Sequence, residues 1–404
     1  MSRLREMIQE LCPDGVEYRK LGEISSRVCS GGTPQASNPS YYTGNIPWLR
    51  TQEVNWGYIY DTDIKISKEA LQNSSAQWIS ENCVIVAMYG ATAAKVAINR
   101  IPLTTNQACC NLKINEKMAD YKYVYYWLSS QYEKLKAKGQ GSQSNINKKI
   151  IEQYPIPVPP LPIQNEIVKL LDNFTELTAE LTAELVLRKK QYNFYRDGLL
   201  KFPSNTKRYK TGDIFNIQNG YTPSKKQSSY WEHGTIPWYR MEDIRANGRI
   251  LYDAIQHVHY SGVKGNLYPE KSILMATTAT IGEYALLMTS SLSNQQMTNF
   301  SIKKEFKELL DVKFAFYYFH VFAEWCKKNA NQSGGMPIIT TAKLKTFSFP
   351  IPPLEVQQKI VSTLDRFDAL CNDLTQGLPA EIAARKKQYE YYRDKLLTFR
   401  RKGA

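Results

Sequence analysis

Apolar residues recur every three or four positions in two long stretches of the chain. In the first stretch the steps between them are 4, 3, 4, 3, 4, 4, 7, 3 and 4, and the residues are Ile163, Ile167, Leu170, Phe174, Leu177, Leu181, Leu185, Tyr192, Tyr195 and Leu199. This spacing predicts a long helix with a heptad seam. The extra step of four between Leu181 and Leu185 is a stutter. It coincides with a tandem Thr-Ala-Glu-Leu at 178–181 and 182–185.

The second stretch is a near copy of the first. Residues 157–202 and 350–399 share a Pro-Pro-Leu start and an Arg-Lys-Lys-Gln-Tyr run near the end. Between its Leu-Asp and Arg-Lys-Lys anchors the second copy carries four more residues than the first. Those residues add about 6 Å of helical rise. Gly377-Leu378-Pro379 predicts a kink or short break in the second copy. Each copy is compatible with a core helix of an all-α domain, but two matching seams favour an antiparallel coiled coil.

The segments before the two helices also resemble each other. Gly-Asn-Ile-Pro-Trp-Leu-Arg at 44–50 matches Gly-Thr-Ile-Pro-Trp-Tyr-Arg at 234–240, at an offset of 190. Short apolar runs at 83–88 and 272–276 predict buried strands, and aromatic-rich runs at 121–138 and 313–328 predict helices. We therefore predict a mixed α+β protein in which two similar α/β domains are separated by two long antiparallel helices with pseudo-twofold symmetry. The expected domains are 1–155, 156–202, 203–349 and 350–404.

The composition indicates the kind of partner and the cellular compartment. Lys and Arg number 52 against 38 Asp and Glu, and this net charge of +14 favours a polyanionic partner such as nucleic acid. Seven scattered Cys without a C-x-x-C pair are typical of reduced thiols in the cytoplasm. The pair His257 and His259 has no third ligand nearby, so we expect no metal site. The first residues do not form a signal peptide, and no apolar run approaches the ~18 residues of a membrane span.

The motifs of common catalytic centres are missing from the sequence. It contains no G-x-x-x-x-G-K-[ST] phosphate loop, no glycine-rich cofactor fingerprint after a strand, and no (Asn/Asp)-Pro-Pro-(Tyr/Phe) methylation motif. No acidic cluster with a following Lys indicates a metal-dependent nuclease. We therefore expect no catalytic residue in this chain.

The chain resembles a specificity subunit of a Type I DNA restriction–modification enzyme, of the kind with TAEL repeats in its central helix. The resemblance covers essentially the whole chain and rests on the paired G-x-T-P and I-P-W segments, the P-P-L-x-x-Q helix starts, the R-K-K-Q-Y-x-x-Y-R-D-x-L-L helix ends and the tandem TAEL. It implies two target-recognition domains, each reading one half of a split site in double-stranded DNA. It also implies that the helices set the spacer and dock two modification subunits, with restriction subunits joining the complex. S-adenosylmethionine, ATP and Mg²⁺ then belong to the partner subunits.

Candidate DNA-binding residues come from loops at matching positions of the two domains. Arg, Lys, Asn, Gln and Thr side chains read base edges and phosphates. In the first domain the candidates are Thr33, Gln35, Arg50, Gln52, Tyr89, Thr92, Gln107, Gln143 and Asn145. In the second they are Thr222, Lys225, Lys226, Arg240, Glu242, Thr278, Thr280, Gln295 and Gln332. We interpret Trp48 and Trp238 as packing anchors rather than base stackers.

Candidate partner-binding residues lie on the helix seam and the aromatic helix ends. They are Leu177, Leu181, Leu185, Tyr192, Tyr195, Leu374, Tyr389 and Tyr392. The sequence leaves open which of them face the sister helix instead. Two other function classes also remain open: an enzyme, which would need a cofactor motif, and a coiled-coil scaffold or adaptor without DNA specificity. The net charge and the two matched α/β domains argue against the adaptor.

Overall fold

The chain divides into two compact units that each combine an α/β domain with parts of the long helices. The computed structural model describes residues 2–139, 145–332, 335–373 and 376–403. Unit 1 comprises residues 1–180 and 384–404, and unit 2 comprises residues 181–383. The division therefore gives each unit a part of both long helix copies.

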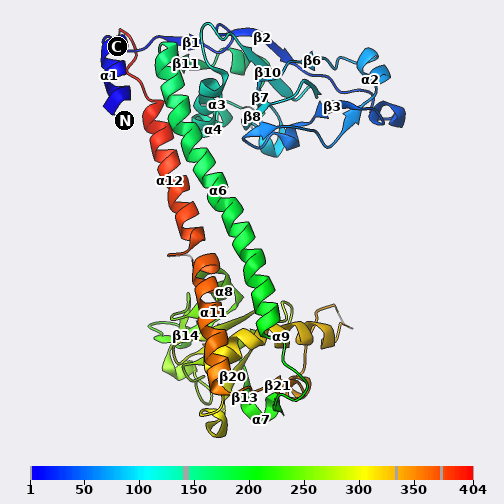
Figure 1. The fold of residues 1–404 in the computed structure, drawn as a ribbon, viewed down its shortest axis with the longest axis vertical. Coiled ribbons are helices and arrows are strands. Elements are labelled where there is room, and N and C mark those ends of the chain that lie inside the picture. Colours follow the sequence, from blue (N-terminus) through cyan, green and yellow to red (C-terminus); the bar gives the residue numbers. More distant parts are fainter. Residues whose placement is uncertain (1, 140–144, 333–334, 374–375, 404) are drawn as a thin grey trace. The chain divides into compact units, whose positions relative to one another are not determined.

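Unit 1 is built on two sheets and a short strand pair. A five-stranded sheet has the order β2-β10-β7-β8-β4, a four-stranded sheet has the order β5-β3-β9-β6, and β1 pairs with β11 (Figure 1). The strands are β1 (Tyr18–Lys20), β2 (Ser25–Ser30), β3 (Ile46–Leu49), β4 (Tyr58–Ile59), β5 (Lys65–Ile66), β6 (Trp78–Ile79), β7 (Val84–Ala87), β8 (Val96–Asn99), β9 (Leu103–Thr105), β10 (Cys109–Ile114) and β11 (Pro155–Pro157). The helices preceding the long one are α1 (Ser2–Leu11), α2 (Lys68–Gln72), α3 (Tyr121–Ser130), α4 (Tyr132–Lys136) and α5 (Lys148–Glu152), with short 3-10 turns η1 (Pro39–Tyr42), η2 (Thr51–Glu53) and η3 (Gly90–Thr92).

Unit 2 repeats the larger sheet with the same strand arrangement. Its orders are β13-β20-β17-β18-β15, β16-β14-β19 and β12-β21. The strands are β12 (Arg208–Lys210), β13 (Phe215–Asn219), β14 (Ile236–Tyr239), β15 (Ile250–Leu251), β16 (His257–Val258), β17 (Ser272–Ala276), β18 (Tyr284–Leu287), β19 (Leu292–Ser293), β20 (Met297–Ile302) and β21 (Ser348–Pro350). The helices are α7 (Thr211–Ile214), α8 (Met241–Asn247), α9 (Val312–Asn329) and α10 (Thr341–Leu344), with 3-10 turns η4 (Ser228–Tyr230), η5 (Tyr260–Gly262) and η6 (Lys304–Phe306).

The long helices agree with the apolar spacing, including the break. The first copy is one helix, α6 (Leu161–Leu199), and the second is split into α11 (Leu354–Asn372) and α12 (Leu378–Leu396). The split lies next to the predicted Gly377-Leu378-Pro379 interruption. Both helix copies start directly after Pro-Pro. Pro is tolerated there because the first N–H groups of a helix have no intrahelical acceptor, so its missing N–H costs nothing.

Aromatic and aliphatic side chains of the terminal helix of each domain form its core. Tyr123 on α3 and Phe314 on α9 are both fully buried, as the sequence predicts for these aromatic runs. One predicted helix is wrong in extent: 121–138 is interrupted at Gln131, whose N–H is shared between the Trp127 and Leu128 carbonyls. The helix therefore restarts as α4. Among the described residues, no helix is long and apolar enough to cross a membrane.

Candidate nucleic-acid interface

In unit 1 the repeated Thr and Gln candidates meet at the end of a parallel strand pair. Strands β3 and β9 run parallel, with Trp48 opposite Thr104. Beyond their carboxyl ends the Thr33 hydroxyl donates to the Gln107 side-chain oxygen. Backbone hydrogen bonds from Asn106 N to Leu49 O and from Gly32 N to Thr105 O, each 2.9 Å, fix the two loops beside each other. Residues 74 positions apart in the sequence therefore form one exposed edge.

Unit 2 builds the same edge from the matching residues. Strands β14 and β19 are parallel, and the Thr222 hydroxyl donates to the Gln295 side-chain oxygen at 2.5 Å. The Asn294 N–H donates to Tyr239 O at 3.1 Å. Two loop sequences that share only a few anchors thus produce the same polar arrangement.

A buried tryptophan anchors each of these edges. Trp48 is 5% exposed and its indole N–H donates to Gly32 O at 2.9 Å. Trp238 is 2% exposed and donates to Tyr221 O at 3.0 Å. Because both rings are buried and hydrogen-bonded, they cannot stack on bases. The structure confirms their interpretation as packing anchors.

The arginine two residues after each tryptophan is positioned by a carboxylate on its own loop. Arg50 N donates to Glu53 Oε1 at 3.1 Å, and Arg240 N donates to Asp243 Oδ2 at 2.7 Å. The side chains are 27% and 28% exposed. Neither Nε atom has a hydrogen-bond partner among the described residues, because the nearest carboxylate oxygens are 3.6 Å away, on Glu53 and on Glu242. Both Nε atoms are buried, and the terminal nitrogens of Arg50 donate to the Gln52 amide oxygen at 2.8 and 3.1 Å. Two partly exposed guanidinium groups therefore occupy equivalent places.

The remaining candidates of unit 1 extend this edge. The Thr92 hydroxyl donates to Thr51 O at 2.7 Å, which joins η3 to η2. Asn145 Oδ1 accepts from Gly90 N at 3.4 Å. Tyr89 is 41% exposed, and Gln35 and Gln52 are also exposed. The structure therefore brings Arg50, Gln52, Tyr89, Thr92 and Asn145 together through η2 and η3. Gln143 lies outside the described residues.

The candidates of unit 2 are less concentrated. Thr278 forms an isolated bridge with Ile338, and Thr280 N donates to Thr278 O, so this turn packs against the 335–338 segment. Glu242 lies in the first turn of α8, 3.6 Å from Arg240. Lys225, Lys226 and Gln332 are exposed. Only Thr222, Gln295, Arg240 and Glu242 are placed near each other by the strand pair β14 and β19.

A buried glutamine attaches each domain to its long helix. In unit 1, Gln164 on α6 accepts from Asp120 N at 2.9 Å and donates to Pro159 O at 2.7 Å and Met118 O at 3.2 Å. In unit 2, Gln357 on α11 accepts from Asp311 N at 2.9 Å and donates to Pro352 O and Leu309 O at 2.7 and 2.8 Å. Both side chains are fully buried.

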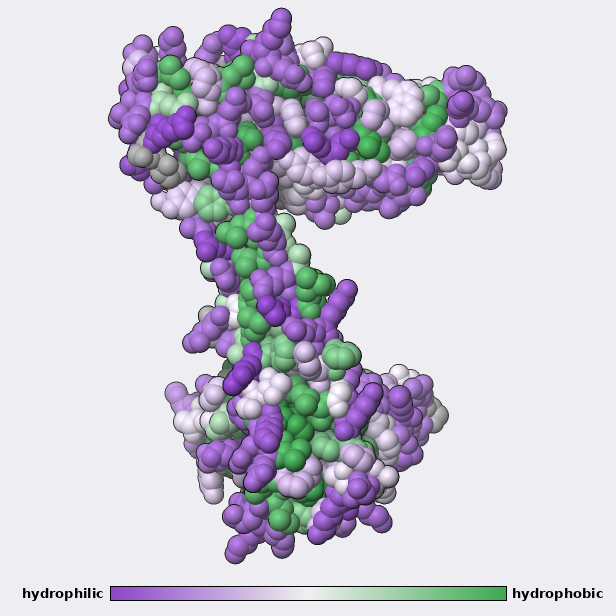
Figure 2. All heavy atoms as spheres, in the orientation of Figure 1, coloured by the Kyte–Doolittle hydropathy of each residue, from purple (hydrophilic) through white to green (hydrophobic). Residues whose placement is uncertain are grey.

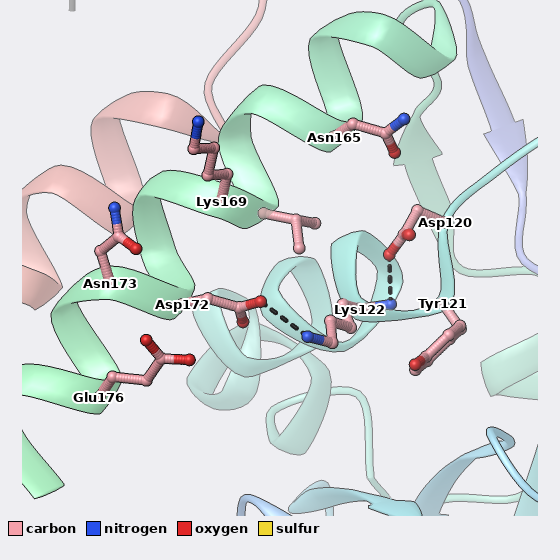
Figure 3. Close-up of a pocket in the computed structure, with 9 residues that line it drawn as sticks. Asp120, Tyr121, Lys122, Asn165, Lys169, Asp172, Asn173 and Glu176 are labelled. Carbon is pink, nitrogen blue, oxygen red and sulfur yellow. Dashed lines mark hydrogen bonds and ion pairs between the residues drawn. The ribbon is translucent and has the colours of Figure 1, made fainter.

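An aspartate two turns further along each helix completes the attachment. Asp172 accepts from Lys122 Nζ at 2.7 Å (Figure 3). It also accepts from the Tyr126 hydroxyl at 2.7 Å. In unit 2, Asp365 accepts from Lys313 Nζ and from the Tyr317 hydroxyl, again both at 2.7 Å. Burial followed by the bond to Asp172 raises the pKa of Tyr126, and the same causes raise the pKa of Tyr317. We call these two sets of residues the attachment networks.

Sequence reasoning did not assign these positioning residues. The Gln of P-P-L-x-x-Q and the repeated Leu-Asp were visible only as repeats, and their partners Lys122 and Lys313 were not singled out. Glu53 and Asp243 were also missed. Their signal is the acidic residue three positions after Arg50 and Arg240, which is the spacing of a capping box.

The partner-binding candidates divide between core and surface. Tyr192 is 5% exposed and packs near Phe367, so it is a core residue of unit 2 and not available on the surface. Tyr195 stacks on Phe367 at 5.5 Å but remains 43% exposed, and Leu177 is 37% exposed. Tyr392 stacks on Phe174 at 5.5 Å and Tyr389 packs on Tyr126 at 6.5 Å, both within unit 1. Leu181 and Leu185 are half-buried, and Leu374 lies outside the described residues.

Part of the apolar surface of the long helices is exposed among the described residues. Val186 is 50% exposed, Leu187 64% and Phe194 76%. Figure 2 shows hydrophobic side chains along these helices. A pair of helices buries one stripe of each, so further apolar positions stay on the surface. Among the described residues, no group of His, Cys, Asp and Glu could hold a metal ion.

Comparison with known proteins identifies the fold family. The family model "Type I restriction modification DNA specificity domain" matches residues 13–187 and 203–384. The chain is 38% identical over 298 residues to the EcoR124I/EcoR124II specificity subunit of Escherichia coli, covering 69% of this chain and 70% of that protein. It is 30% identical to the putative specificity subunit S.HindORF215P of Haemophilus influenzae, covering 95% and 96%.

Solved structures share the fold at low sequence identity. The S subunit from M. genitalium aligns with a TM-score of 0.58 and 16% identity, covering 95% of this chain and 96% of that chain. A chain solved in work on complex assembly and conformational transition of the type I R-M system aligns with a TM-score of 0.62 and 16% identity, covering 95% and 97%. Taken with the two matched domains, these relatives show that the chain belongs to the non-catalytic DNA specificity subunits of Type I restriction–modification enzymes.

Proposed function

We propose that each domain reads one half of an asymmetric, bipartite target in double-stranded DNA through the loop edge beyond its parallel strand pair. The observation that carries the proposal is the repeated Trp-x-Arg frame. In both units a buried Trp and a capping carboxylate hold a partly exposed Arg next to a Thr–Gln pair. A partly exposed guanidinium group suits the bidentate contact with guanine in the major groove. The divergent loops around the two frames suit two different half-sites.

The long helices are proposed to set the spacer and to dock two modification subunits, and restriction subunits join through the complex. The exposed Val186, Leu187 and Phe194 support docking, because a partner helix would bury them. S-adenosylmethionine, ATP and Mg²⁺ are assigned to the partner subunits. The complex is expected to work in the cytoplasm, where its DNA lies.

Single substitutions in the two frames test the reading of half-sites. Arg50→Ala is expected to relax or abolish recognition of one half-site, and Arg240→Ala that of the other. Each base contact contributes about 1–3 kcal/mol, or roughly 5- to 150-fold in discrimination. The measurement is methylome sequencing of a host that expresses the complete system. Arg100→Ala is the matched control, since this exposed Arg of unit 1 bonds Asn82 and Tyr121 instead. Unchanged half-sites in both variants would refute the proposal.

Deletion of residues 182–185 tests the spacer. Removing one TAEL shortens α6 by about one turn, or roughly 6 Å, and is expected to shorten the non-specific spacer without changing either half-site. A spacer of unaltered length in the methylome would rule out the helix as the length-setting element.

A further inference from the structure

The two units differ at the entrance to their first strand. Val158 N donates to Glu17 O at 2.9 Å, and Ile351 N donates to Lys207 O at 2.9 Å, so Glu17 and Lys207 occupy equivalent positions. In unit 2 a short link after Phe202 leads directly into this strand. In unit 1 the same place receives the C-terminal segment, because Val16 N donates to Arg400 O at 2.8 Å, and helix α1 precedes it. Among the described residues of unit 2, helix α1 therefore has no counterpart.

Helix α1 is amphipathic, and its apolar stripe is used inside unit 1. Leu4 is 3% exposed, and Met7 and Ile8 pack against the same core, which also contains Ile163 and Met118. These three positions follow the i, i+3, i+4 spacing of one helix face. Arg3, Arg5, Glu6 and Glu10 supply the polar face.

The repeat-equivalent surface of unit 2 is uncovered. Ile163 is 0% exposed, whereas its equivalent Val356 is 40% exposed. Leu161 and Met118 are half-buried in unit 1. Their equivalents Leu354 and Leu309 are 41% and 47% exposed. A position that belongs to the same apolar core as helix α1 in unit 1 is thus an apolar surface in unit 2.

This surface is a groove. It has a volume of about 710 Å³ and is lined by apolar side chains that include Phe202, Tyr209, Leu309, Ile351, Leu354 and Val356. Lys207 and Glu308 stand among the lining residues and give it one charge of each sign. The mixed-charge polar face of α1 shows the kind of helix that complements such a surface.

We propose that this groove docks an amphipathic helix of another subunit of the restriction–modification complex, with an apolar stripe spaced like Leu4, Met7 and Ile8 and with charges of both signs beside it. The occupant is a partner's helix and not α1 of a second copy, because the stripe of α1 is already buried in its own unit. The proposal rests on the proposed function only in that the chain works within such a complex.

Photo-crosslinking in the purified complex of specificity, modification and restriction subunits tests the proposal. A benzophenone amino acid replaces Val356 in one variant and Leu309 in another, and exposed Tyr252 of unit 2 is replaced as the control. The expected result is a crosslink from positions 356 and 309, but not 252, to one partner segment with i, i+3, i+4 apolar spacing. Crosslinks to a second copy of this chain, to scattered partner sites, or to none would overturn the proposal.

A substitution gives an independent readout. Val356→Glu is expected to weaken co-purification of that partner by about tenfold, roughly 1.4 kcal/mol, while the Tyr252→Glu control leaves it unchanged. Since Val356 is on the surface, unit 2 should keep its fold, which circular dichroism checks. If that variant unfolds, Leu309→Glu on a different segment replaces it.

DNA binding by the isolated variant, measured by gel shift, is expected to be unchanged. Failure of the docking proposal is therefore distinguished from failure of the proposed DNA recognition. Unaltered co-purification with both variants would contradict the proposal.

Discussion

Units 1 and 2 are nearly identical where a domain meets its long helix and differ where the domain presents loops. In the attachment networks, Gln164 and Gln357 make the same three hydrogen bonds, and both aspartates accept from a Lys and a Tyr at 2.7 Å. The loop edges share the Trp-x-Arg frame, but η2 in unit 1 is replaced by helix α8 in unit 2. The difference teaches that the orientation of each domain on its helix is kept, while the surface beyond the frame is free to change.

The units also solve one packing problem differently. In unit 1 the N–H of Gly57 donates to the Tyr125 hydroxyl at 2.8 Å. In unit 2 the equivalent position is Arg249, whose guanidinium lies 4.4 Å from the Tyr284 ring centre and 4.8 Å from that of Phe316. Phe316 occupies the position of Tyr125 in unit 1. Unit 2 therefore lacks the Tyr hydroxyl at this position and has the Arg249 guanidinium over the ring instead.

The largest expected effect comes from removing the attachment glutamine of one unit. Gln164→Leu leaves the Asp120 N–H and two carbonyls buried without partners, which costs about 3–5 kcal/mol. Hydrogen exchange should rise in α3 and the start of α6 and stay unchanged in unit 2, and Gln357→Leu should show the reverse. Asn165→Leu, next to Gln164 but exposed, is the control. Equal losses in both units from either variant would mean that they do not unfold separately.

The next effect concerns Arg249. Arg249→Ala removes the cation and its alkyl stem from between two rings, and we expect unit 2 to lose about 2 kcal/mol. Denaturant unfolding, followed by exchange of the α9 amides, measures the loss. Arg245→Ala on the exposed face of α8 should change little. An unchanged stability of unit 2 would show that the Arg249 guanidinium does not stabilise the packing around Tyr284 and Phe316.

A smaller effect is the difference in coupling energy between the ion pairs of the two attachment networks. The Lys122 and Asp172 side chains are 27% and 21% exposed, whereas Lys313 and Asp365 are 44% and 37% exposed. Solvent screens the pair of unit 2 more, so we expect coupling energies of about 1 kcal/mol in unit 1 and about 0.5 kcal/mol in unit 2. Double-mutant cycles with Lys→Met and Asp→Asn measure them. A stronger coupling in unit 2 would contradict this order.

The smallest effect is a dependence on pH in unit 2. His320 occupies the position of Ser129, and burial followed by the charge of Arg196 lowers its pKa below the ordinary 6.5, against the opposing Asp197. The unfolded chain then binds a proton on His320 more readily than the folded chain does. The stability of unit 2 that depends on neutral His320 is therefore fully present at about pH 7 and is lost as the pH falls through 6.5. After solvent screening the loss is below about 1 kcal/mol.

His320→Ser should remove this dependence and make unit 2 behave like unit 1 between pH 7 and 5. The measurement compares denaturant midpoints of the two proteins at both pH values. If the parent and the variant lose the same stability on acidification, His320 is not responsible.

The sequence predicts the long elements of this fold well because their signals are long. Ten apolar positions define α6, and Gly377-Leu378-Pro379 marks the break before α12. The pairing of β3 with β9 was not predictable, since strands of four and three residues carry no periodic signal and the pairing is distant in sequence. The Thr33–Gln107 contact can nevertheless be predicted from the sequence, because both residues recur in the second domain. The role of Lys122 cannot, because only the folded packing of α3 against α6 brings it to Asp172.

The composition of unit 1 has a consequence for the order in which a ribosome completes the protein. Leu396 and Leu397 are 6% and 1% exposed in the core of unit 1, and Lys402 N donates to Val16 O at 2.9 Å. All residues of unit 2 are synthesised before Ala384, but unit 1 receives the core residues Leu396 and Leu397 only twelve and thirteen positions later. The first domain to emerge is therefore the last to be finished.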